Sequence, residues 1–318
     1  MEQNYNNLPI KNISIATREA VDYIKARREH NITSLKTRWN KLNTCIMGGI
    51  EPNVIITITG ISGSGKSSIA NTLETDIIDL NKEANPIVLS FTIEMLSFRQ
   101  IGRKLSNKLR KTTSELYSSN KDLTDGDYYN LVKVAKTFLD YPIYYVDDPG
   151  TPAQIKQTIM SFYETYVKGT GRPFVIIYDH ALLTTKVGST LDTVSDLQSV
   201  FITVKKLPLT SIIELSQMNR NIEAPERIMN PTSHFPIRSD ISSSDSIFQA
   251  SDYVLVVHRP ELLGITSYGP NHWLVSDKIY IHILKNRDAG KPTILQFEND
   301  LKYNNLIEIV AEDKTVQQ

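Results

Sequence analysis

A glycine- and serine-rich segment is the strongest chemical signal in the sequence. Residues 60–67 read GISGSGKS and match the pattern G-x-x-x-x-G-K-[ST] of phosphate-binding loops. Glycines let the backbone approach phosphate oxygens closely, and the N–H groups at the start of a following helix favour an anion. The candidate nucleotide-binding residues are those of the loop and the serine after it: Gly60, Ser62, Gly63, Ser64, Gly65, Lys66, Ser67 and Ser68.

The last two residues of this loop predict a nucleoside triphosphate and Mg²⁺. In such loops the lysine, here Lys66, reaches the β- and γ-phosphates, and the hydroxyl that follows, here Ser67, ligates Mg²⁺. The metal also needs a carboxylate at the end of a neighbouring strand. Asp179 follows the apolar run VIIY at residues 175–178, so Ser67 and Asp179 are the expected metal ligands.

Three charged residues are candidates for the hydrolytic step. Glu94 lies just past an apolar run at residues 86–91, where it could orient or deprotonate water; the alternative is a solvated glutamate in a first helical turn. Lys285 and Arg287 are two apart on a predicted strand, so they share a face and could clamp a phosphoryl group. They could equally be solvated surface cations, and the sequence leaves open whether they act in cis or in trans.

The elements that position these residues follow from the apolar pattern. Five continuous, β-branched-rich runs predict strands buried on both faces: residues 54–59, 86–91, 174–178, 211–215 and 253–257. Helical periodicity or capping signals follow at residues 68–80, 151–166 and 192–207. This alternation predicts an α/β fold with a mostly parallel twisted sheet flanked by helices. Residues 279–284 and 293–297 flank Asp-Ala-Gly at 288–290 and predict an antiparallel C-terminal hairpin.

The N-terminal segment has a different pattern from the rest of the chain. Apolar residues recur at helical spacing from Ile13 to about residue 30, with three cations near the end of that run. We therefore expect an N-terminal arm with an amphipathic helix over residues 1–31 and one large domain over residues 32–318. The helix packs either on its own domain or on a neighbour.

Composition excludes several classes of protein. The chain has 318 residues, with 35 basic and 35 acidic side chains. It has no apolar run of about 18 residues and no signal-peptide pattern, so no membrane contact is expected. The single cysteine, Cys45, excludes an intrachain disulfide and fits a reducing cytoplasm. A charge sum of zero usually argues against nucleic acid as a partner, but it says nothing about local patches.

Together, the motifs resemble the RecA-like ATPase domain of hexameric replicative helicases of the DnaB type. Five ordered segments carry the resemblance: FTIEM at 91–95, IIYD at 176–179, LSQMNR at 215–220, SDI with IFQASD at 239–252, and KNRD followed by Gly290 at 285–290. The resemblance implies an ATP hydrolase with Glu94 as catalytic base and Gln217 as sensor of the γ-phosphate. It also implies that Lys285 and Arg287 reach the nucleotide of the adjacent subunit. Its expected cofactors are ATP and Mg²⁺, and its expected partners are single-stranded DNA and further copies of the chain in a hexamer.

Three departures from the family qualify these expectations. Only the arm before residue 32 stands where the family has a primase-binding domain, so coupling to primase is doubtful and a phage-like helicase acting in a host cytoplasm is expected. The segment after Asp179 reads HALL instead of Y-L-Q-L, and His180 is interpreted as structural. The DNA-gripping loop S-D-L-R-E-S-G is SDISSSD at 239–245, with Ser242 for the arginine and Asp245 for the glycine, so a weaker grip on DNA is expected.

The resulting hypothesis is an ATP-dependent replicative helicase motor that moves 5′ to 3′ on single-stranded DNA. The alternatives are a RecA-like recombinase or clock-type ATPase, and a nucleotide-gated DNA-binding or loading subunit without unwinding. Six cations and no acid lie between Arg99 and Lys111; this stretch is interpreted as a solvated face, or else as a contact with a subunit or DNA.

Overall fold

The computed structural model describes residues 8–120, 123–232, 234–242, 244–287 and 292–310. Contacts divide the chain into two compact units, Met1–Ser34 and Leu35–Gln318. In the first unit, α1 (Ile13–Arg28) begins where the Asn12 side chain accepts a hydrogen bond from the Ile15 N–H at 3.0 Å. None of the residues of α1 is buried. The predicted helix is confirmed, although it ends two residues early.

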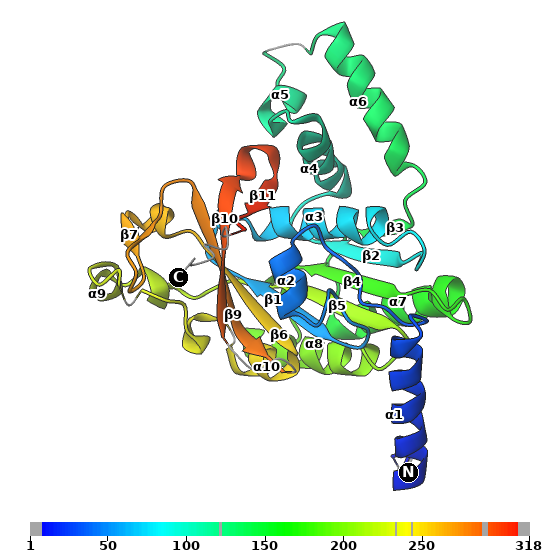
Figure 1. Cartoon of the computed structure of the whole chain (residues 1–318). Helices are drawn as coiled ribbons and strands as arrows, with labels where there is room; N and C mark the ends of the chain where they lie inside the picture. The colour runs from blue at the N-terminus through cyan, green and yellow to red at the C-terminus, as the bar shows by residue number, and fades with distance from the viewer. Residues whose placement is uncertain (1–7, 121–122, 233, 243, 288–291, 311–318) are drawn as a thin grey trace, which may run out of the picture. The chain divides into compact units, whose positions relative to one another are not determined.

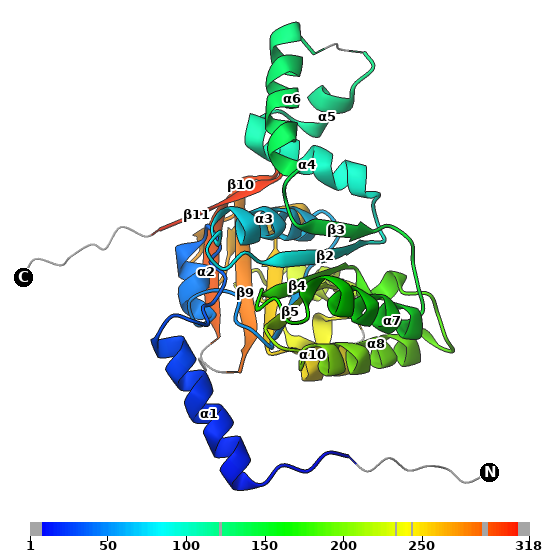
Figure 2. The ribbon, with the colours of Figure 1, turned by 90° about the vertical axis from the view of Figure 1, so that its right-hand side faces the viewer.

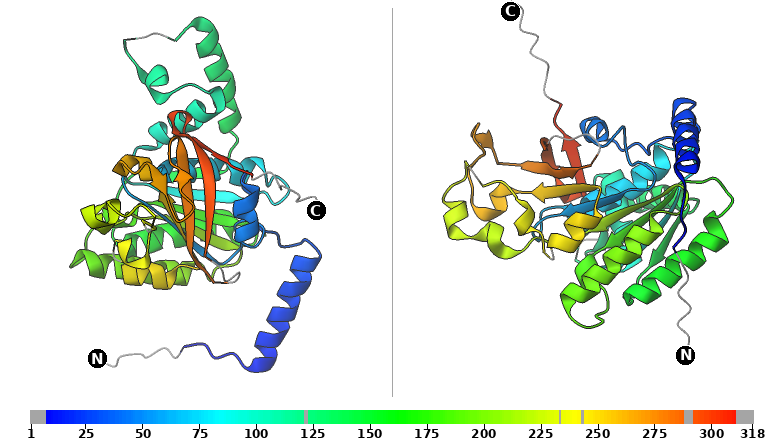
Figure 3. Two further views of the ribbon diagram at one scale, coloured as in Figure 1. Left: turned by 60° about the vertical axis from the view of Figure 1, so that its left-hand side comes forward. Right: turned by 90° about the horizontal axis from the view of Figure 1, so that it is seen from below.

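One sheet organises the second unit. Within the described residues its strand order is β11-β10-β9-β6-β1-β5-β4-β2-β3. The parallel strands are β1 (Ile55–Thr59), β2 (Ile87–Thr92), β3 (Ile143–Val146), β4 (Phe174–Asp179), β5 (Thr210–Leu215) and β6 (Tyr253–His258). The antiparallel strands, side by side in Figure 3, are β9 (Lys278–Asn286), β10 (Thr293–Asp300) and β11 (Asn305–Glu308).

All five predicted parallel strands and the antiparallel hairpin are therefore confirmed. The hairpin's predicted connection at residues 288–290 lies outside the described residues. Four strands were not predicted from the sequence. They are β3 and β11, which form the two edges of the sheet, and the short pair β7 (Ser267–Tyr268) and β8 (Trp273–Leu274). Both edge strands have only four residues, and β3 has no fully buried residue, so each gives a weaker pattern than the central strands.

Alternate residues of the central strands feed two cores on opposite faces of the sheet. In β4, Val175 and Ile177 join the cluster that packs on α3 (Lys66–Asp79) and α2 (Asn40–Cys45). Phe174, Ile176 and Tyr178 join the cluster that packs on α7 (Pro152–Phe162) and α8 (Thr190–Val204). Figures 1 and 2 show α7 and α8 on one side of the sheet and α3 on the other. This double coverage explains why the strands read as unbroken apolar runs.

The helix at α7 begins as predicted. The Thr151 side chain accepts from the Gln154 N–H, the Gln154 side chain accepts from the Thr151 N–H, and Pro152 occupies the first turn. After Phe162 the chain continues as a π-helical segment, Tyr163–Val167. The remaining α-helices are α4 (Ser97–Leu109), α5 (Thr113–Tyr117), α6 (Asp125–Phe138), α9 (Pro225–Ile228) and α10 (Ser244–Ala250).

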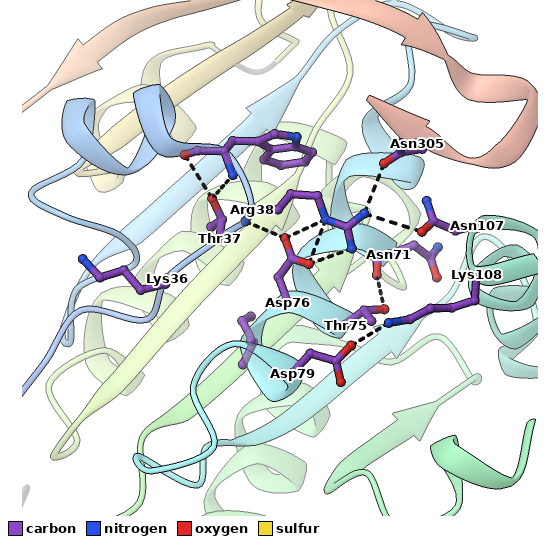
Figure 4. Close-up of polar contacts among 12 residues, drawn as sticks. Lys36, Thr37, Arg38, Asn71, Thr75, Asp76, Asp79, Asn107, Lys108 and Asn305 are labelled. Atoms are coloured by element: carbon purple, nitrogen blue, oxygen red, sulfur yellow. Dashed lines mark hydrogen bonds and ion pairs between the residues drawn. The ribbon is translucent and has the colours of Figure 1, made fainter. Parts of the chain in front are cut away.

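The basic stretch from Arg99 to Lys111 does not form one solvated face. It lies on α4 and just beyond, where α4, α5 and α6 project from the sheet (Figure 1). Lys104 is buried and its Nζ lies 2.6 Å from a Glu74 carboxylate oxygen on α3. Lys108 pairs with Asp79 at 2.7 Å, beside a second network in which Arg38 contacts Asp76 (Figure 4). The solvated interpretation is wrong for Lys104 because acids distant in sequence fold against this helix.

Candidate nucleotide site

The loop at residues 60–65 connects β1 to α3, as the motif requires. Gly65, with φ of +108°, is the residue before the first turn of α3. A side chain at Gly60 would bring its Cβ within 2.4 Å of the Val257 carbonyl oxygen. At Gly65 both the backbone angle and the neighbouring Leu301 side chain, 3.0 Å from a built Cβ, disfavour any other residue. Tight packing therefore requires these two glycines, and α3 directs its first N–H groups at the loop.

Lys66 supplies a cation within this loop. Its Nζ donates hydrogen bonds to the carbonyls of Gly60 at 2.8 Å and Ile61 at 2.9 Å. Burial lowers its pKa to about 8, although Asp179 and Glu94 act in the opposite direction. The ammonium therefore lies among polar groups that a phosphate could replace.

Asp179 and Ser67 form the predicted oxygen pair. Asp179 ends β4, is buried, and forms a side-chain hydrogen bond with Ser67. Burial and the nearby Glu94 raise the Asp179 pKa to about 6, while Ser67, Arg103 and Lys66 oppose the rise. A carboxylate and a hydroxyl are hard oxygen donors suited to Mg²⁺, which usually keeps waters and substrate phosphates as its other ligands. No group of three or more His, Cys, Asp or Glu side chains in the described residues could hold a metal by itself.

Glu94 lies just beyond β2 and lines a cavity together with Lys66 and Ser67. Its side chain is 52% exposed, so water can reach the carboxylate, and His180 Nε2 lies 4.0 Å from it. The His180 Nδ1 atom accepts a hydrogen bond from the Leu182 N–H. Burial lowers the His180 pKa, which favours the neutral ring.

These residues surround a cavity of about 380 Å³. Eight of the predicted residues line it: Ser62, Gly63, Gly65, Lys66, Ser67, Ser68, Glu94 and Gln217. Gly60, Ser64 and Asp179 are not part of the lining. Gly60 lies next to the Ser64 side chain, and Asp179 is hydrogen-bonded to Ser67, which does line the cavity.

Two arginines of the lining were not predicted. Arg103 comes from α4. Burial lowers its pKa, and the nearby carboxylates of Asp179 and Glu94 oppose that shift. Arg259 follows β6 and donates to the Gly63 carbonyl at 3.1 Å, and its buried Nε has no partner among the described residues. No spacing rule could place Arg103 here, because α4 reaches the pocket only through its packing on α3.

Gln217 connects the cavity to the segment SDISSSD at residues 239–245, called the serine-rich loop below. It lies just past β5, and its carbonyl accepts a hydrogen bond from the Ser242 N–H at 2.9 Å. Met218 and Ile241 form an isolated antiparallel bridge beside it. Ser243, which the sequence analysis included in this loop, lies outside the described residues.

Lys285 and Arg287 lie far from this cavity. Asn286 pairs with Tyr253 at the start of β6, whereas the phosphate loop follows the far end of the neighbouring strand β1. The two cations and the phosphate loop are therefore separated by the length of a strand, about five residues at roughly 3.3 Å each. The expectation that both cations lie on one strand needs correction, because β9 ends at Asn286 and Arg287 is the next residue.

A family model now identifies the chain. The model of the DnaB-like helicase C-terminal domain matches residues 34–305. The chain belongs to the DnaB-like helicase family. It is thus an ATP-hydrolysing DNA helicase by class, and the RecA-like fold that the motifs implied is confirmed.

Two solved structures share this fold. A solved ATPase domain superposes with a TM-score of 0.77 at 17% identity, covering 95% of this chain and all of that domain. A DnaB-like replicative helicase, whose structure was described with its interactions with primase, superposes with a TM-score of 0.75 at 17% identity, covering 96% of this chain and 68% of that one. No curated protein sequence matches the chain. None of the helices in the described residues is both long and apolar enough to cross a membrane.

Proposed function

We propose that this chain is the motor of a replicative helicase that uses ATP hydrolysis to move 5′ to 3′ along single-stranded DNA. The direction of movement and the expectation of a hexameric ring of subunits come from the family resemblance. One observation carries the proposal of assembly: Lys285 and Arg287 lie beside the start of β6, at the opposite end of the parallel strands from the chain's own nucleotide cavity. A site that uses these cations on ATP must therefore be completed by a second copy.

The cavity is proposed to divide the chemistry among its residues. Lys66 binds the β- and γ-phosphates, and Ser67 and Asp179 hold Mg²⁺, which neutralises phosphate charge when bound. Glu94 orients and deprotonates the attacking water, and Gln217 contacts the γ-phosphate. Arg103, beside Glu94 and Asp179, adds a second cation from the same chain.

DNA is proposed to contact the serine-rich loop. A groove of about 710 Å³ is lined by Leu191, Asp192, Ser195, Asn219, Ile241, Ser242, Asp245 and Ser246. The arginines nearby are engaged with acids: Arg238 pairs with Asp245 at 2.7 Å, and Arg227 with Asp240 at 2.5 Å. Serine hydroxyls and backbone N–H groups can still contact phosphates, so we expect a weak grip. The bond from Ser242 to Gln217 offers a path from hydrolysis to this loop.

A mixing experiment tests assembly through Arg287. The Arg287→Ala and Lys66→Ala variants should each lack ATPase activity, and the former should still bind ATP. When the two variants are mixed, some interfaces combine the intact phosphate loop of an Arg287→Ala subunit with the intact arginine of a Lys66→Ala subunit. ATPase activity should therefore reappear. If activity does not return at any ratio, although both variants assemble, Arg287 does not act in trans.

A strand-displacement assay separates the motor from a second candidate function. The serine at position 242, where the family loop has its arginine, also fits a nucleotide-gated DNA-binding or loading subunit without unwinding. Displacement of a duplex with a 5′ tail but not with a 3′ tail, together with ATPase stimulated by single-stranded DNA, supports the motor. ATP binding without displacement on either substrate supports the gate. A recombinase- or clock-type ATPase is the remaining alternative, and open filaments instead of rings in electron micrographs would favour it.

A further inference from the structure

The buried carboxylate of Asp252 holds Arg287 beside the start of β6, at the opposite end of the parallel strands from the nucleotide cavity. Asp252 precedes β6, and its side chain is 5% exposed. Its Oδ1 atom lies 2.6 Å from Arg287 Nη1, and its Oδ2 atom accepts from the Ile55 N–H at 2.8 Å. The Asp252 carbonyl also accepts a hydrogen bond from the Arg287 N–H at 3.1 Å. Asp252 thus holds both the backbone and the guanidinium of Arg287.

A second cation shares the same carboxylate. Lys205, just past α8, places its Nζ 2.6 Å from Asp252 Oδ2. A buried carboxylate left without a cation would be strongly destabilising. Because Lys205 and the Ile55 N–H bind Oδ2, Asp252 remains neutralised when Arg287 turns part of its guanidinium toward another anion.

The neighbouring Lys285 is held by different groups. An extra residue, Leu284, interrupts the pairing of β9 with β6, which re-aims the strand at this point. Lys285 Nζ donates to the carbonyls of Phe248 and Gln249 at the end of α10, and it lies 5.1 Å from the centre of the Phe248 ring. Asp252 therefore pairs directly with the arginine, whereas it acts on Lys285 only through its charge at longer range.

We propose that Asp252 is a positioning residue for Arg287, which holds the guanidinium where it meets the nucleotide of the adjacent subunit. This inference rests on the proposed function. Arginine suits the role because its planar group has five N–H donors. It can bond Asp252 with one edge and a phosphate with another. The 50% exposure of the Arg287 side chain leaves donors free for that contact.

The Asp252→Asn variant tests the proposal in the full-length protein. The amide oxygen can still accept from the Ile55 N–H, but the charge that holds Arg287 is lost. We expect kcat for ATP to fall about 10- to 100-fold, as for a misplaced catalytic group, with KM changed less than about twofold because the phosphate loop is untouched. An unchanged kcat would overturn the proposal.

Asp76→Asn is a matched control. Asp76 is equally buried, pairs with an arginine (Arg38) at 2.7 Å, and also accepts from a backbone N–H (Figure 4). It contacts neither Lys285 nor Arg287. This variant should lose stability like Asp252→Asn but keep kcat within about twofold. If both variants lose kcat equally, Asp252 has only a structural role and the proposal fails.

Mixing separates this proposal from the proposed function. Asp252→Asn subunits have an intact phosphate loop, so mixing them with Lys66→Ala subunits should restore ATPase activity, as Arg287→Ala subunits should. Recovery with Arg287→Ala but not with Asp252→Asn would overturn the positioning role alone. Recovery with neither would overturn the trans action of Arg287 itself.

Arg287→Lys provides a second variant if Asp252→Asn does not fold. The side chain is half exposed, so the fold should tolerate it, and the positive charge is kept. Because a compact ammonium cannot bond Asp252 and a phosphate from opposite edges, kcat should fall about as far as in Asp252→Asn. A kcat equal to that of the unmodified protein would overturn the proposal.

Discussion

At the scale of single residues, the nucleotide cavity places one exposed carboxylate among several cations. Glu94 is half exposed, whereas Asp179 is buried behind Ser67. A water molecule can therefore reach Glu94 more easily than Asp179. This difference in exposure supports the roles proposed from the sequence, hydrolysis for Glu94 and metal binding for Asp179.

The Glu94→Gln variant should bind ATP but hydrolyse it at least about 100-fold more slowly, since a general base contributes about 10²- to 10⁴-fold. ATP binding by fluorescence titration and turnover by phosphate release measure the two properties separately. Glu226→Gln, an exposed glutamate on α9, is the control and should behave like the unmodified protein. Undiminished hydrolysis in Glu94→Gln would contradict the role of Glu94.

At the scale of elements, a buried polar network ties α4 to α3 and so brings Arg103 to the cavity. Lys104 contacts Glu74 at 2.6 Å and the Asn71 side chain at 2.6 Å. Tyr145 on β3 donates to Glu74 at 3.1 Å. Removing one partner leaves a buried charge unpaired.

Lys104→Ala should therefore lower the free energy of unfolding by about 3–5 kcal/mol. Lys108→Ala, on the same helix, breaks the partly exposed pair with Asp79 and should cost only about 0–1 kcal/mol. Urea denaturation followed by circular dichroism compares the two. Equal losses would mean that the buried pair does not anchor α4.

A second element-scale feature is a stack of three buried histidines. His258 at the end of β6 lies 5.3 Å from His234 and 6.2 Å from His282, measured between ring centres. Burial lowers the pKa of all three, that of His282 to about 3, and neighbouring rings and Arg227 lower that of His258 further. The Tyr268 hydroxyl pairs with His282 Nε2 at 2.9 Å, and Asp240 opposes the shift only at His234.

This stack should make the protein less stable as the pH falls below about 6.5, the ordinary histidine value. The unfolded chain takes up these protons first, so each histidine removes up to about 1.4 kcal/mol per pH unit. Glu214 is buried and its pKa is raised to about 8. Its contribution to the pH dependence has the opposite sign, because it makes the protein more stable as the pH falls toward 4.5. Variants must therefore separate the two contributions.

His258→Gln should flatten the decline of unfolding free energy between pH 6.5 and about 5, because it removes one titrating ring. His272→Gln, at an exposed histidine, should leave the slope unchanged. Urea denaturation across this pH range provides the measurement. A slope in His258→Gln equal to that of the unmodified protein would show that the stack does not set the acid response.

At the scale of the whole molecule, the charge sum of zero does not describe where the charges lie. Several cations of α4 are paired with acids of the same chain, and those near the serine-rich loop pair with Asp240 and Asp245. In the described residues the two arginines beside this loop, Arg227 and Arg238, are therefore already paired on one copy, whereas an assembly would present the same loop several times.

Binding of single-stranded DNA should therefore be weak, dependent on assembly and strongly sensitive to salt. Fluorescence anisotropy with a labelled oligonucleotide, at about 50 and 200 mM salt, should show a loss of about tenfold or more in affinity for the assembled protein. Tight, salt-insensitive binding by an isolated monomer would contradict this picture.

Features that depend on neighbours along the chain could be predicted without the structure. The phosphate loop, five of the six parallel strands and the N-terminal turn of α7 each follow from local geometry or an unbroken apolar run, and these were predictable. Asp179 was predictable too, because the end of a strand is a local position.

Contacts between residues distant in the sequence, in contrast, became known only from the folded arrangement. Arg103 joins the cavity and Lys104 becomes buried because α4 packs on α3, and no periodicity in either helix encodes that contact. The separation of Arg287 from the cavity depends on β9 running antiparallel to β6, which carries Arg287 to Asp252 at the opposite end of the parallel strands. Strand direction is a property of the assembled sheet, because it is set by packing between segments far apart in the chain.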